Sequence, residues 1–341
     1  MINVFDFFSG CGGSSLGFQN LGFKIIGALD SDRDSANTFQ HNFPKSDFIN
    51  ADIRKVKPED LSDTIKKAGK GPLLFCGCAP CQPFSNQRKI SPIIDKRKTL
   101  LSEFQRFVVF WKPDYIFLEN VPGLQRIGSS CDVFKKFTNK LSRLKYNFDT
   151  AIVQASSLGV PQKRKRFILI ASAENYKISS LQSIIDRYSG FFPKTRDFIH
   201  DLPPIIAGET HPNVPNHTAA KLSPRNLKRI RNTPEGGDRR DWPAHLKIGG
   251  HKNYKGHTDV YGRMEWDAPA STLTTRCISY SNGRFGHPEQ DRAISVREAA
   301  RLQTFPDDFI FMGSLNSCAK QVGNAVPPLM AQRISECFIQ G

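Results

Sequence analysis

A cysteine between two prolines is the residue whose setting most strongly suggests covalent chemistry. Cys81 lies in the segment Pro80-Cys81-Gln82-Pro83, shortly after the apolar run Leu73 to Cys76. A free thiol with a pKa of about 8.5 is only a few per cent thiolate at neutral pH, so a nucleophilic cysteine needs positive surroundings. Basic residues follow closely, at Arg88, Lys89, Lys96, Arg97 and Lys98. The pattern favours a nucleophilic thiol. Residues 86–98 would suit a mobile lid over a bound substrate, with a long surface loop as the simpler alternative.

Metal binding is the competing interpretation of this segment, because Cys76, Cys78 and Cys81 have the spacing C-x-C-x-x-C. Cys76 belongs to the apolar run, however, and no fourth cysteine or histidine lies within thirty residues of the three. We therefore expect no metal site.

A carboxylate and a basic run lie next to two further apolar segments. Glu119 comes directly after Tyr115 to Leu118, and Lys163-Arg164-Lys165-Arg166 precedes Phe167 to Ile170. If the strands before Cys81 and Glu119 are parallel neighbours, both side chains face one crevice at the carboxyl ends of the strands. Taken alone, an acidic strand end is more often a cap or a surface charge, and a basic run usually binds phosphate or faces solvent.

A glycine-rich segment suggests a second binding function. The apolar run that begins the chain leads into Ser9-Gly10-Cys11-Gly12-Gly13, and a helix is expected from about Leu16. Backbone N–H groups in such a turn can approach a nucleotide, amino acid or phosphate closely. Asp30 follows about twenty residues later, where a carboxylate can bind ribose hydroxyls, and Asp52 offers another. Together they indicate an adenosine-containing cofactor, although a tight strand-to-helix turn is the simpler alternative.

Short apolar runs separated by longer polar segments predict an α/β domain with a parallel sheet. Strands are predicted at residues 4–8, 24–29, 73–76, 115–118 and 167–170. Helices are predicted at residues 100–111, 133–144, 295–305 and 329–338. After Ser172, repeated prolines and few apolar patterns predict a second, loop-rich module.

Composition indicates the kind of partner and the compartment. A net charge of +16 favours polyanions, and nucleic acid is the first of these to consider. Eight cysteines in 341 residues are too few for a disulfide scaffold, and no apolar run is long enough to span a membrane. We therefore expect a cytoplasmic protein with reduced thiols and no membrane partner, associated with the nucleoid if it is bacterial.

Five blocks in order resemble the DNA (cytosine-5) methyltransferases. They are Asp6 to Gly13, Pro80 to Ser85, Glu119-Asn120-Val121, Gln162 to Arg166 and Gln321 to Asn324. The resemblance implies the doubly wound, mostly parallel sheet of S-adenosylmethionine-dependent methyltransferases, with a smaller, loop-rich recognition domain. It implies a catalytic and cofactor-binding domain at residues 1–192 plus 321–341 and a target-recognition domain at residues 193–320.

The resemblance also implies roles for particular residues. S-adenosylmethionine, which becomes S-adenosylhomocysteine, would be held by Phe8, Gly10, Gly12, Gly13, Asp30, Asp52, Ile53, Leu100 and Asn324. Cys81 would add to carbon 6 of a cytosine that has left the duplex, which activates carbon 5 for methylation. Glu119 would bind the ring at N3 and the exocyclic amine, and Arg166, supported by Arg164, would hold O2.

The implied partner is double-stranded DNA, bound by a monomer, together with a cognate restriction endonuclease that acts on the same site. Phosphate contacts are expected among Lys221, Arg225, Lys228, Arg229, Arg231, Arg239 and Arg240. Base contacts are expected among Arg263, Thr272, Thr274, Thr275, Arg276, Asn282 and Arg284.

Three other functions stay open on the sequence. A nicotinamide-dependent oxidoreductase could use Gly10 to Gly13 and Asp30, but it would leave Cys81 and Glu119 without a role, and Ser15 breaks its G-x-G-x-x-G pattern. A catalytically silent DNA-binding protein would need neither Cys81 nor Glu119. An RNA cytosine-5 methyltransferase is the nearest alternative, because relatives with the same nucleophile can act on RNA.

Overall fold

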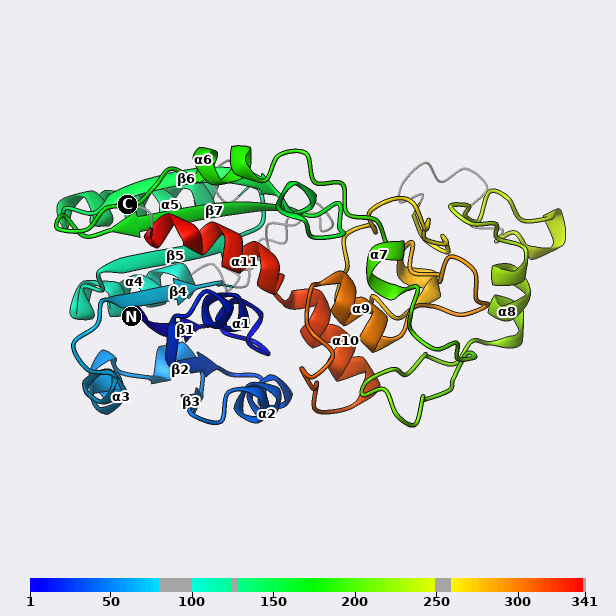
Figure 1. Ribbon diagram of the computed structural model, residues 1–341, viewed down its shortest axis with the longest axis horizontal. Coiled ribbons are helices and arrows are strands. Elements are labelled where there is room, and N and C mark those ends of the chain that lie inside the picture. Colours follow the sequence, from blue (N-terminus) through cyan, green and yellow to red (C-terminus); the bar gives the residue numbers. More distant parts are fainter. Residues whose placement is uncertain (80–99, 124–127, 249–258, 340–341) are drawn as a thin grey trace. The chain divides into compact units, whose positions relative to one another are not determined.

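Seven strands of the described chain form one sheet in the order β3-β2-β1-β4-β5-β7-β6 (Figure 1). The computed structural model describes residues 1–79, 100–123, 128–248 and 259–339, and only the main chain of residues 128–132. The strands are β1 Asn3–Phe7, β2 Lys24–Asp30, β3 Asp47–Asn50, β4 Leu73–Gly77, β5 Tyr115–Asn120, β6 Asn147–Gln154 and β7 Lys165–Ser172. All pairs from β3 to β5 are parallel, whereas β7 is antiparallel to both of its neighbours. The predicted mostly parallel α/β sheet is confirmed.

Helices cover both faces of this sheet. They are α1 Gly13–Asn20, α2 Arg33–Asn42, α3 Ser62–Ala68, α4 Leu100–Trp111, α5 Gly128–Arg143, α6 Leu181–Arg187 and α11 Pro328–Ser335. Alternate residues of a strand point to opposite faces. Phe5 and Phe7 of β1 therefore pack with Phe104 and Phe107 of α4, while Asp6 between them binds serines of α1.

The end of the chain returns to this sheet through α11, which packs on α1 (Figure 1). Their close approach depends on Gly17. A Cβ atom at this position would lie 2.4 Å from the carbonyl oxygen of Pro328 and 2.7 Å from Cβ of Ala331. Gly17 thus lets two helices far apart in sequence touch through their backbones.

The described residues divide into two compact units. The first comprises Met1–Leu158, Lys165–Gly190 and Val326–Gly341, and the second comprises Gly159–Arg164 and Phe191–Ala325. The short segment Gly159–Arg164 belongs to the second unit because Gln162 donates hydrogen bonds to the carbonyl of Leu302 and to Gln303. The units differ from the predicted domains in this segment, at residues 191–192 and at residues 321–325.

Loops make up most of the second unit. Its helices are α7 Arg196–Ile199, α8 Pro224–Arg231, α9 Val296–Leu302 and α10 Leu315–Asn324, with 3-10 turns at Ala244–Leu246 and Tyr280–Asn282. A capping box is present at the start of α9: Glu298 N–H donates to the Ser295 hydroxyl, and Ser295 N–H donates to the Glu298 carboxylate. None of the described helices is long and apolar enough to cross a membrane.

Two strands were missed by the sequence prediction. β3 is only four residues long and partly exposed, and β6 is an edge strand whose burial is interrupted along its length. Both lack the continuous apolar run that identifies a strand buried on two faces. By contrast, α4 begins and ends where it was predicted, and Pro113 follows it by two residues.

Candidate active site

The glycine-rich segment forms an unusual turn between β1 and α1. Phe8, Gly10 and Gly12 all have positive φ angles, of 57°, 54° and 98°. At Gly12 a Cβ atom would lie 2.5 Å from the ring of Phe43, so no side chain fits there. At Gly10 a Cβ atom would meet nothing within 4 Å, so open space adjoins the backbone. The turn therefore leaves room for a ligand at Gly10 and is held by packing at Gly12.

Asp30 connects this turn to the end of β2. Its Oδ2 accepts a hydrogen bond from Gly10 N–H at 2.8 Å, and its Oδ1 accepts one from Asp32 N–H at 2.8 Å. Burial raises the pKa of the Asp30 carboxyl. Each carboxylate oxygen can accept more than one hydrogen bond, so Asp30 can still bind the hydroxyls of a ribose. The structure thus brings together two predicted cofactor residues that are twenty positions apart.

Asp52 already has a partner in the protein. Its carboxylate accepts hydrogen bonds from Nε of Arg54 at 2.9 and 3.1 Å and from the Arg54 backbone N–H at 3.0 Å. These bonds hold the pKa of Asp52 below its usual value. Ile53 and Leu100 are buried in the core beneath the sheet. Asn324, the last residue of α10, is exposed and belongs to the second unit.

Glu119 and Arg166 form the central ion pair of the site. In the antiparallel pairing of β5 with β7, Glu119 lies opposite Ile168, so Arg166 two residues away is on the same face. Nε of Arg166 lies 2.7 Å from Oε1 of Glu119, and the two side chains are only 14% and 10% exposed. Oε1 is nevertheless buried without a hydrogen bond from any described residue, because the contact is an ion pair and not an aligned hydrogen bond.

The chain that leads to the predicted nucleophile leaves the sheet beside this pair. β4 and β5 are parallel, with Gly77 opposite Leu118. Nδ2 of Asn120 donates to the carbonyl oxygen of Ala79 at 3.2 Å, which holds the chain just before Pro80. Cys81, the predicted lid at residues 86–98 and the basic residues between 88 and 98 lie outside the described residues.

Arg164 binds carbonyl oxygens of the second unit. Its side chain is buried, and its guanidinium donates to the carbonyl oxygens of Leu273 at 3.4 Å, Gly323 at 3.3 Å and Ala325 at 3.2 Å. These bonds join three segments of the second unit. Arg164 thus has a structural role, and its support of a contact with the ring's O2 stays a prediction.

Three residues predicted to contact bases have partners inside the protein. Arg263 is 4% exposed and donates to four main-chain carbonyls and to Asp291. Arg284 donates to the carbonyl oxygens of Gly236, Gly237 and Arg263. Thr272 likewise donates its hydroxyl to the Lys163 carbonyl. A chain folded mainly as loops leaves many carbonyls without a sheet or helix partner, and these arginines supply the donors.

Asp6 is a site residue that the sequence prediction did not assign. It is completely buried under the glycine-rich turn, and its Oδ2 accepts hydrogen bonds from the hydroxyls of Ser14 at 2.8 Å and Ser15 at 2.7 Å. Its Oδ1 has no hydrogen-bond partner among the described residues. Burial raises the pKa of Asp6 to about 6 despite the two hydroxyls. An acidic residue inside an otherwise apolar strand was the available signal.

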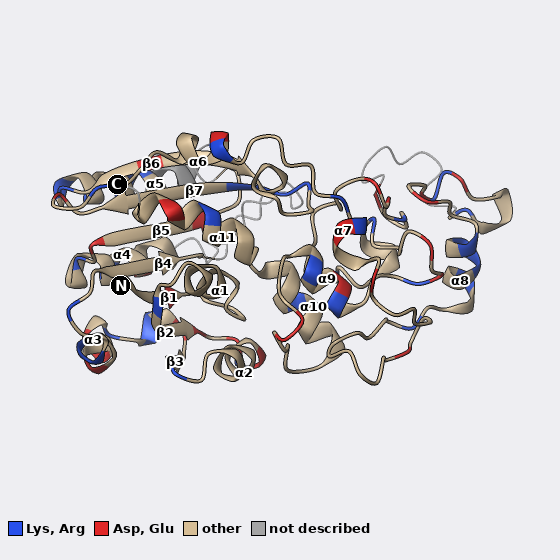
Figure 2. Cartoon of the chain, in the orientation of Figure 1, with Lys and Arg blue, Asp and Glu red and all other residues tan. Residues whose placement is uncertain are grey.

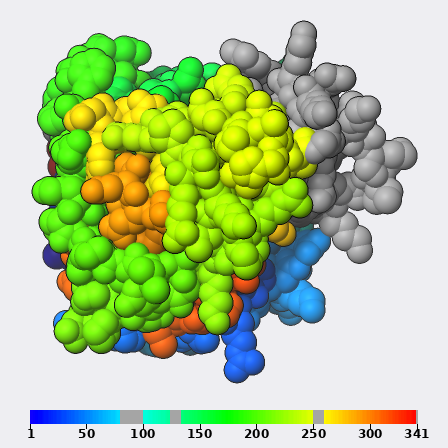
Figure 3. Space-filling model, turned by 90° about the vertical axis from the view of Figure 1, so that its right-hand side faces the viewer, coloured from blue at the N-terminus to red at the C-terminus, as the bar shows by residue number. Residues whose placement is uncertain are grey.

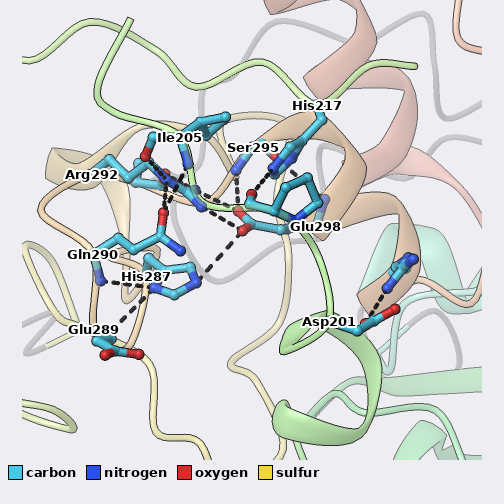
Figure 4. Close-up of polar contacts among 12 residues, drawn as sticks. Asp201, Ile205, His217, His287, Glu289, Gln290, Arg292, Ser295 and Glu298 are labelled. Carbon is cyan, nitrogen blue, oxygen red and sulfur yellow. Dashed lines mark hydrogen bonds and ion pairs between the residues drawn. The ribbon is translucent and has the colours of Figure 1, made fainter. Parts of the chain in front are cut away.

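A second polar cluster lies inside the second unit (Figure 4). Arg292 binds both carboxylate oxygens of Glu298, at 2.6 and 2.7 Å. Burial raises the pKa of Glu298, but the hydrogen bonds and charge of Arg292 outweigh this effect and lower the pKa to about 2. Ser295 contacts Nδ1 of His217 at 2.8 Å, and His287 lies on the other side of Glu298. All these groups have partners inside the protein, so the cluster supports the loops around α9.

Comparisons with known proteins match the whole chain. The family described as C-5 cytosine-specific DNA methylase matches residues 2–340. Type II methylase M.HgiDII of Herpetosiphon aurantiacus is 37% identical over 99% of this chain and 96% of its own length. Type II methyltransferase M1.HphI of Haemophilus parahaemolyticus is 32% identical over 99% of this chain and 87% of its own length. The crystal structure of S. pombe Dnmt2 methyltransferase has the same fold, with a TM-score of 0.66 and 16% identity over 99% of both chains.

Proposed function

The chain belongs to the C-5 cytosine-specific DNA methylase family, and from this premise we propose how it performs its reaction. It is a DNA (cytosine-5) methyltransferase of the type found in Type II restriction-modification systems. We propose that it takes the methyl group from S-adenosylmethionine, that Cys81 bonds covalently to the target base, and that the base leaves the duplex before it reacts. The proposal concerns the cofactor, the nucleophile and the residues that hold the ring.

The observation that carries this proposal is the buried acceptor on Glu119. No described residue gives Oε1 of Glu119 an aligned hydrogen bond, although Arg166 lies within ion-pair distance of it, so this oxygen suits a ligand that brings a donor. Cytosine offers such a donor at its exocyclic amine, and at N3 when that atom is protonated. Arg166, 2.7 Å from the same carboxylate, has N–H groups that suit the O2 of the same ring. The pair therefore fits one edge of a cytosine.

The proposed chemistry starts at carbon 6 of the ring. The thiolate of Cys81 forms a bond to carbon 6, and the electron pair displaced from the ring's double bond makes carbon 5 nucleophilic. Glu119 binds N3 and the amine, and Arg166 stabilises negative charge as it develops at O2. After carbon 5 is methylated, it loses its proton to a base, and the electrons left behind expel Cys81. The nucleophile is thereby regenerated and 5-methylcytosine is released.

The glycine-rich turn and Asp30 would hold S-adenosylmethionine. When bound, this cofactor supplies a methyl group made electrophilic by a sulfonium centre. Open space at Gly10 lets a ligand approach the backbone, and Asp30 has acceptor positions left for ribose hydroxyls. The carboxylates of Asp30 and Asp6 also favour a cation at this end of the sheet. The same site has further proposed members, namely Phe8, Gly12, Gly13, Asp52, Ile53, Leu100 and Asn324.

DNA is the proposed substrate, and residues 193–320 are the proposed target-recognition domain. No group on Glu119 or Arg166 can reach a base that is stacked in a duplex, so the target cytosine must leave the helix at a cost of a few kcal/mol. The type of relative found also suggests a restriction endonuclease that recognises the same site, and we propose action as a monomer.

Bisulfite sequencing tests the activity, the base and its sequence context together. Plasmid DNA is isolated from cells that express the chain, the Glu119→Gln variant or the Lys66→Gln variant, whose changed residue is exposed on α3. We expect protected cytosines at one sequence context for the wild type and the Lys66 variant, and at least a 100-fold lower methylation rate for Glu119→Gln. Protection found in cellular RNA and absent from DNA would overturn the choice of substrate.

A trapping experiment tests the covalent step. Duplex DNA with 5-fluorocytosine at the target position cannot lose a proton from carbon 5, so a covalent complex should accumulate with wild-type protein and S-adenosylmethionine. Peptide mapping should place the bond at Cys81. The Cys81→Ser variant should bind the same DNA without forming the complex. Turnover without any trapped complex would argue against the addition mechanism.

A further inference from the structure

Several arginines of the second unit bind groups within the protein and are therefore not available to an external partner. Arg292 and Arg297 are completely buried and bind a carboxylate and main-chain carbonyls. Arg263 and Arg284 bind main-chain carbonyls in the same way. The net charge of +16 therefore overstates the charge available to an external polyanion. The cations that remain exposed decide where a polyanion binds.

Helix α8 is capped at its N-terminus, and one of its sides packs against the rest of the second unit. Ser223 caps its first turn by accepting a hydrogen bond from Asn226 N–H, and Pro224 occupies the first helical position. Ile230 packs into a cluster with Trp242, Leu246 and Tyr280. On the same side, the guanidinium of Arg229 lies 4.9 Å from the ring of Trp242 and donates to the Leu246 carbonyl at 3.2 Å. This packing determines which side of α8 faces outward.

The outward side of α8 carries two cations without partners. Arg225 and Lys228 are exposed and three residues apart, which places them on one side of the helix. Neither forms an ion pair with any residue in the described ranges, and α8 contains no acidic residue. Arg231, one turn further, does have a partner, with Nε 3.3 Å from Asp291. Figure 2 shows the concentration of basic residues on α8, and Figure 3 shows this yellow-green segment at the surface.

We propose that the outer side of α8 binds the phosphates of duplex DNA through Arg225 and Lys228. This inference rests on the proposed function and names the surface that the recognition domain uses to position itself. Two exposed cations on a rigid helix suit the backbone of DNA, which carries one negative charge for about every 1.7 Å of its axis. Such contacts fix orientation and contribute affinity, but they do not read sequence. Arg229 is buried and holds α8 in place through its contacts with Leu246 and Trp242.

The salt dependence of DNA binding tests this surface. A double variant, Arg225→Gln with Lys228→Gln, is compared with a control, Lys66→Gln with Lys70→Gln, two exposed residues of the first unit at or just after α3. Both variants have a net charge of +16 − 2 = +14. The probe is a mixed-sequence 40-base-pair duplex, and its dissociation constant is measured between 50 and 300 mM salt. Each phosphate contact contributes about 0.9 to the slope of log K against log salt.

We expect the α8 variant to lower the magnitude of this slope by about 1.8 and the control to change it by less than 0.5. Thermal midpoints equal to that of the wild type show that both variants are folded. Equal slopes for the two variants would overturn the assignment of α8. Methylation of DNA by the wild type is measured in parallel. If the wild type methylates DNA but the two variants have equal slopes, only the assignment of α8 is refuted. If the wild type neither binds nor methylates DNA, the proposed function is refuted as well.

Discussion

Nε2 of His287 lies 3.6 Å from Oε1 of Glu298, and both side chains are almost completely buried. Nδ1 of the same ring accepts hydrogen bonds from the backbone N–H groups of Glu289 at 3.1 Å and Gln290 at 2.9 Å. A ring whose Nδ1 is an acceptor carries its single proton on Nε2. A second proton would have to enter at Nδ1, where two donors already point. The fold therefore holds His287 in its neutral form.

This arrangement predicts a loss of stability in mild acid. Burial lowers the pKa of His287 to about 4, against the attraction of Glu298, and it also lowers the pKa of His217. The unfolded chain binds its proton at a pKa near 6.5, so stability is complete above that pH and is lost as the pH falls towards 4. The loss from His287 alone amounts to about 3 kcal/mol. Thermal midpoints measured from pH 7.5 to 4.5 should follow this curve.

The His287→Asn variant isolates the contribution of this ring. Its side-chain carbonyl can accept the same two N–H bonds but does not titrate, so the variant should lose less stability between pH 6.5 and 4.5 than the wild type. His245→Asn changes an exposed histidine of the same unit and serves as the control. A wild-type pH profile in the His287 variant would show that another group causes the acid sensitivity.

Asp6 predicts the opposite pH dependence in the first unit. Burial raises its pKa from 3.8 to about 6, so its contribution to stability is complete below pH 4 and is lost as the pH rises through 6. At pH 7.5 the buried charge costs up to about 3 kcal/mol. The Asp6→Asn variant should therefore have a higher thermal midpoint than the wild type at pH 7.5, with much less difference at pH 4.5. Asp63→Asn, at an exposed position on α3, should show no such gain.

A role in cofactor binding would explain why the chain retains a buried charge at Asp6. The carboxylate of Asp6 joins β1 to the first turn of α1 through Ser14 and Ser15, directly beneath the glycine-rich turn. We expect Asp6→Asn to weaken the binding of S-adenosylhomocysteine, measured by calorimetry, by a factor of three to ten even though the protein is more stable. Unchanged affinity would mean that Asp6 has no effect on the cofactor site.

Much of the site in the sheet could be predicted from strand ends. Glu119 was placed at a strand end from its apolar run, whereas the role of Arg166 came from the family resemblance, and the pairing of β5 with β7 brings the two together. Gly10 and Asp30 were assigned in the same way, from the turn after one strand and the end of the next. Parallel strands with short connections leave little choice about which residues meet at their ends.

The second unit could not be predicted at this level. A sequence shows that Arg164, Arg263 and Arg284 are charged, and charge alone suggests exposure and contact with DNA. Their actual partners are main-chain carbonyls of loops, which lie up to 161 residues away along the chain. No local pattern encodes them. Cys81 lies outside the described residues, and its role stays a prediction.

The contact at Gly17 allows a test of how tightly α1 packs on α11. The Gly17→Ala variant places a methyl group 2.4 Å from the carbonyl oxygen of Pro328. To relieve this clash, α1 and α11 would have to move apart and lose part of their packing. We expect it to lower stability by about 1–3 kcal/mol, as overpacking does. It should also weaken cofactor binding, because α1 begins at the glycine-rich turn. Gln19→Ala, on the exposed side of α1, should change neither quantity, and a stable Gly17→Ala protein would contradict the close packing.

Substitutions at Arg263, which is buried, and at Arg276, which is exposed, should have different effects on stability. Arg263→Gln removes donors to the carbonyls of Thr233 at 2.7 Å, Ile230 at 2.9 Å and His287 at 2.9 Å, which leaves buried acceptors unsatisfied. We expect a loss of about 3–5 kcal/mol, seen as a lower thermal midpoint. Bisulfite sequencing should find the same sequence around the methylated cytosine at a permissive temperature. Arg276→Gln, at an exposed position, should keep the wild-type midpoint. A stable Arg263→Gln protein that methylates a different sequence would instead make Arg263 a base contact.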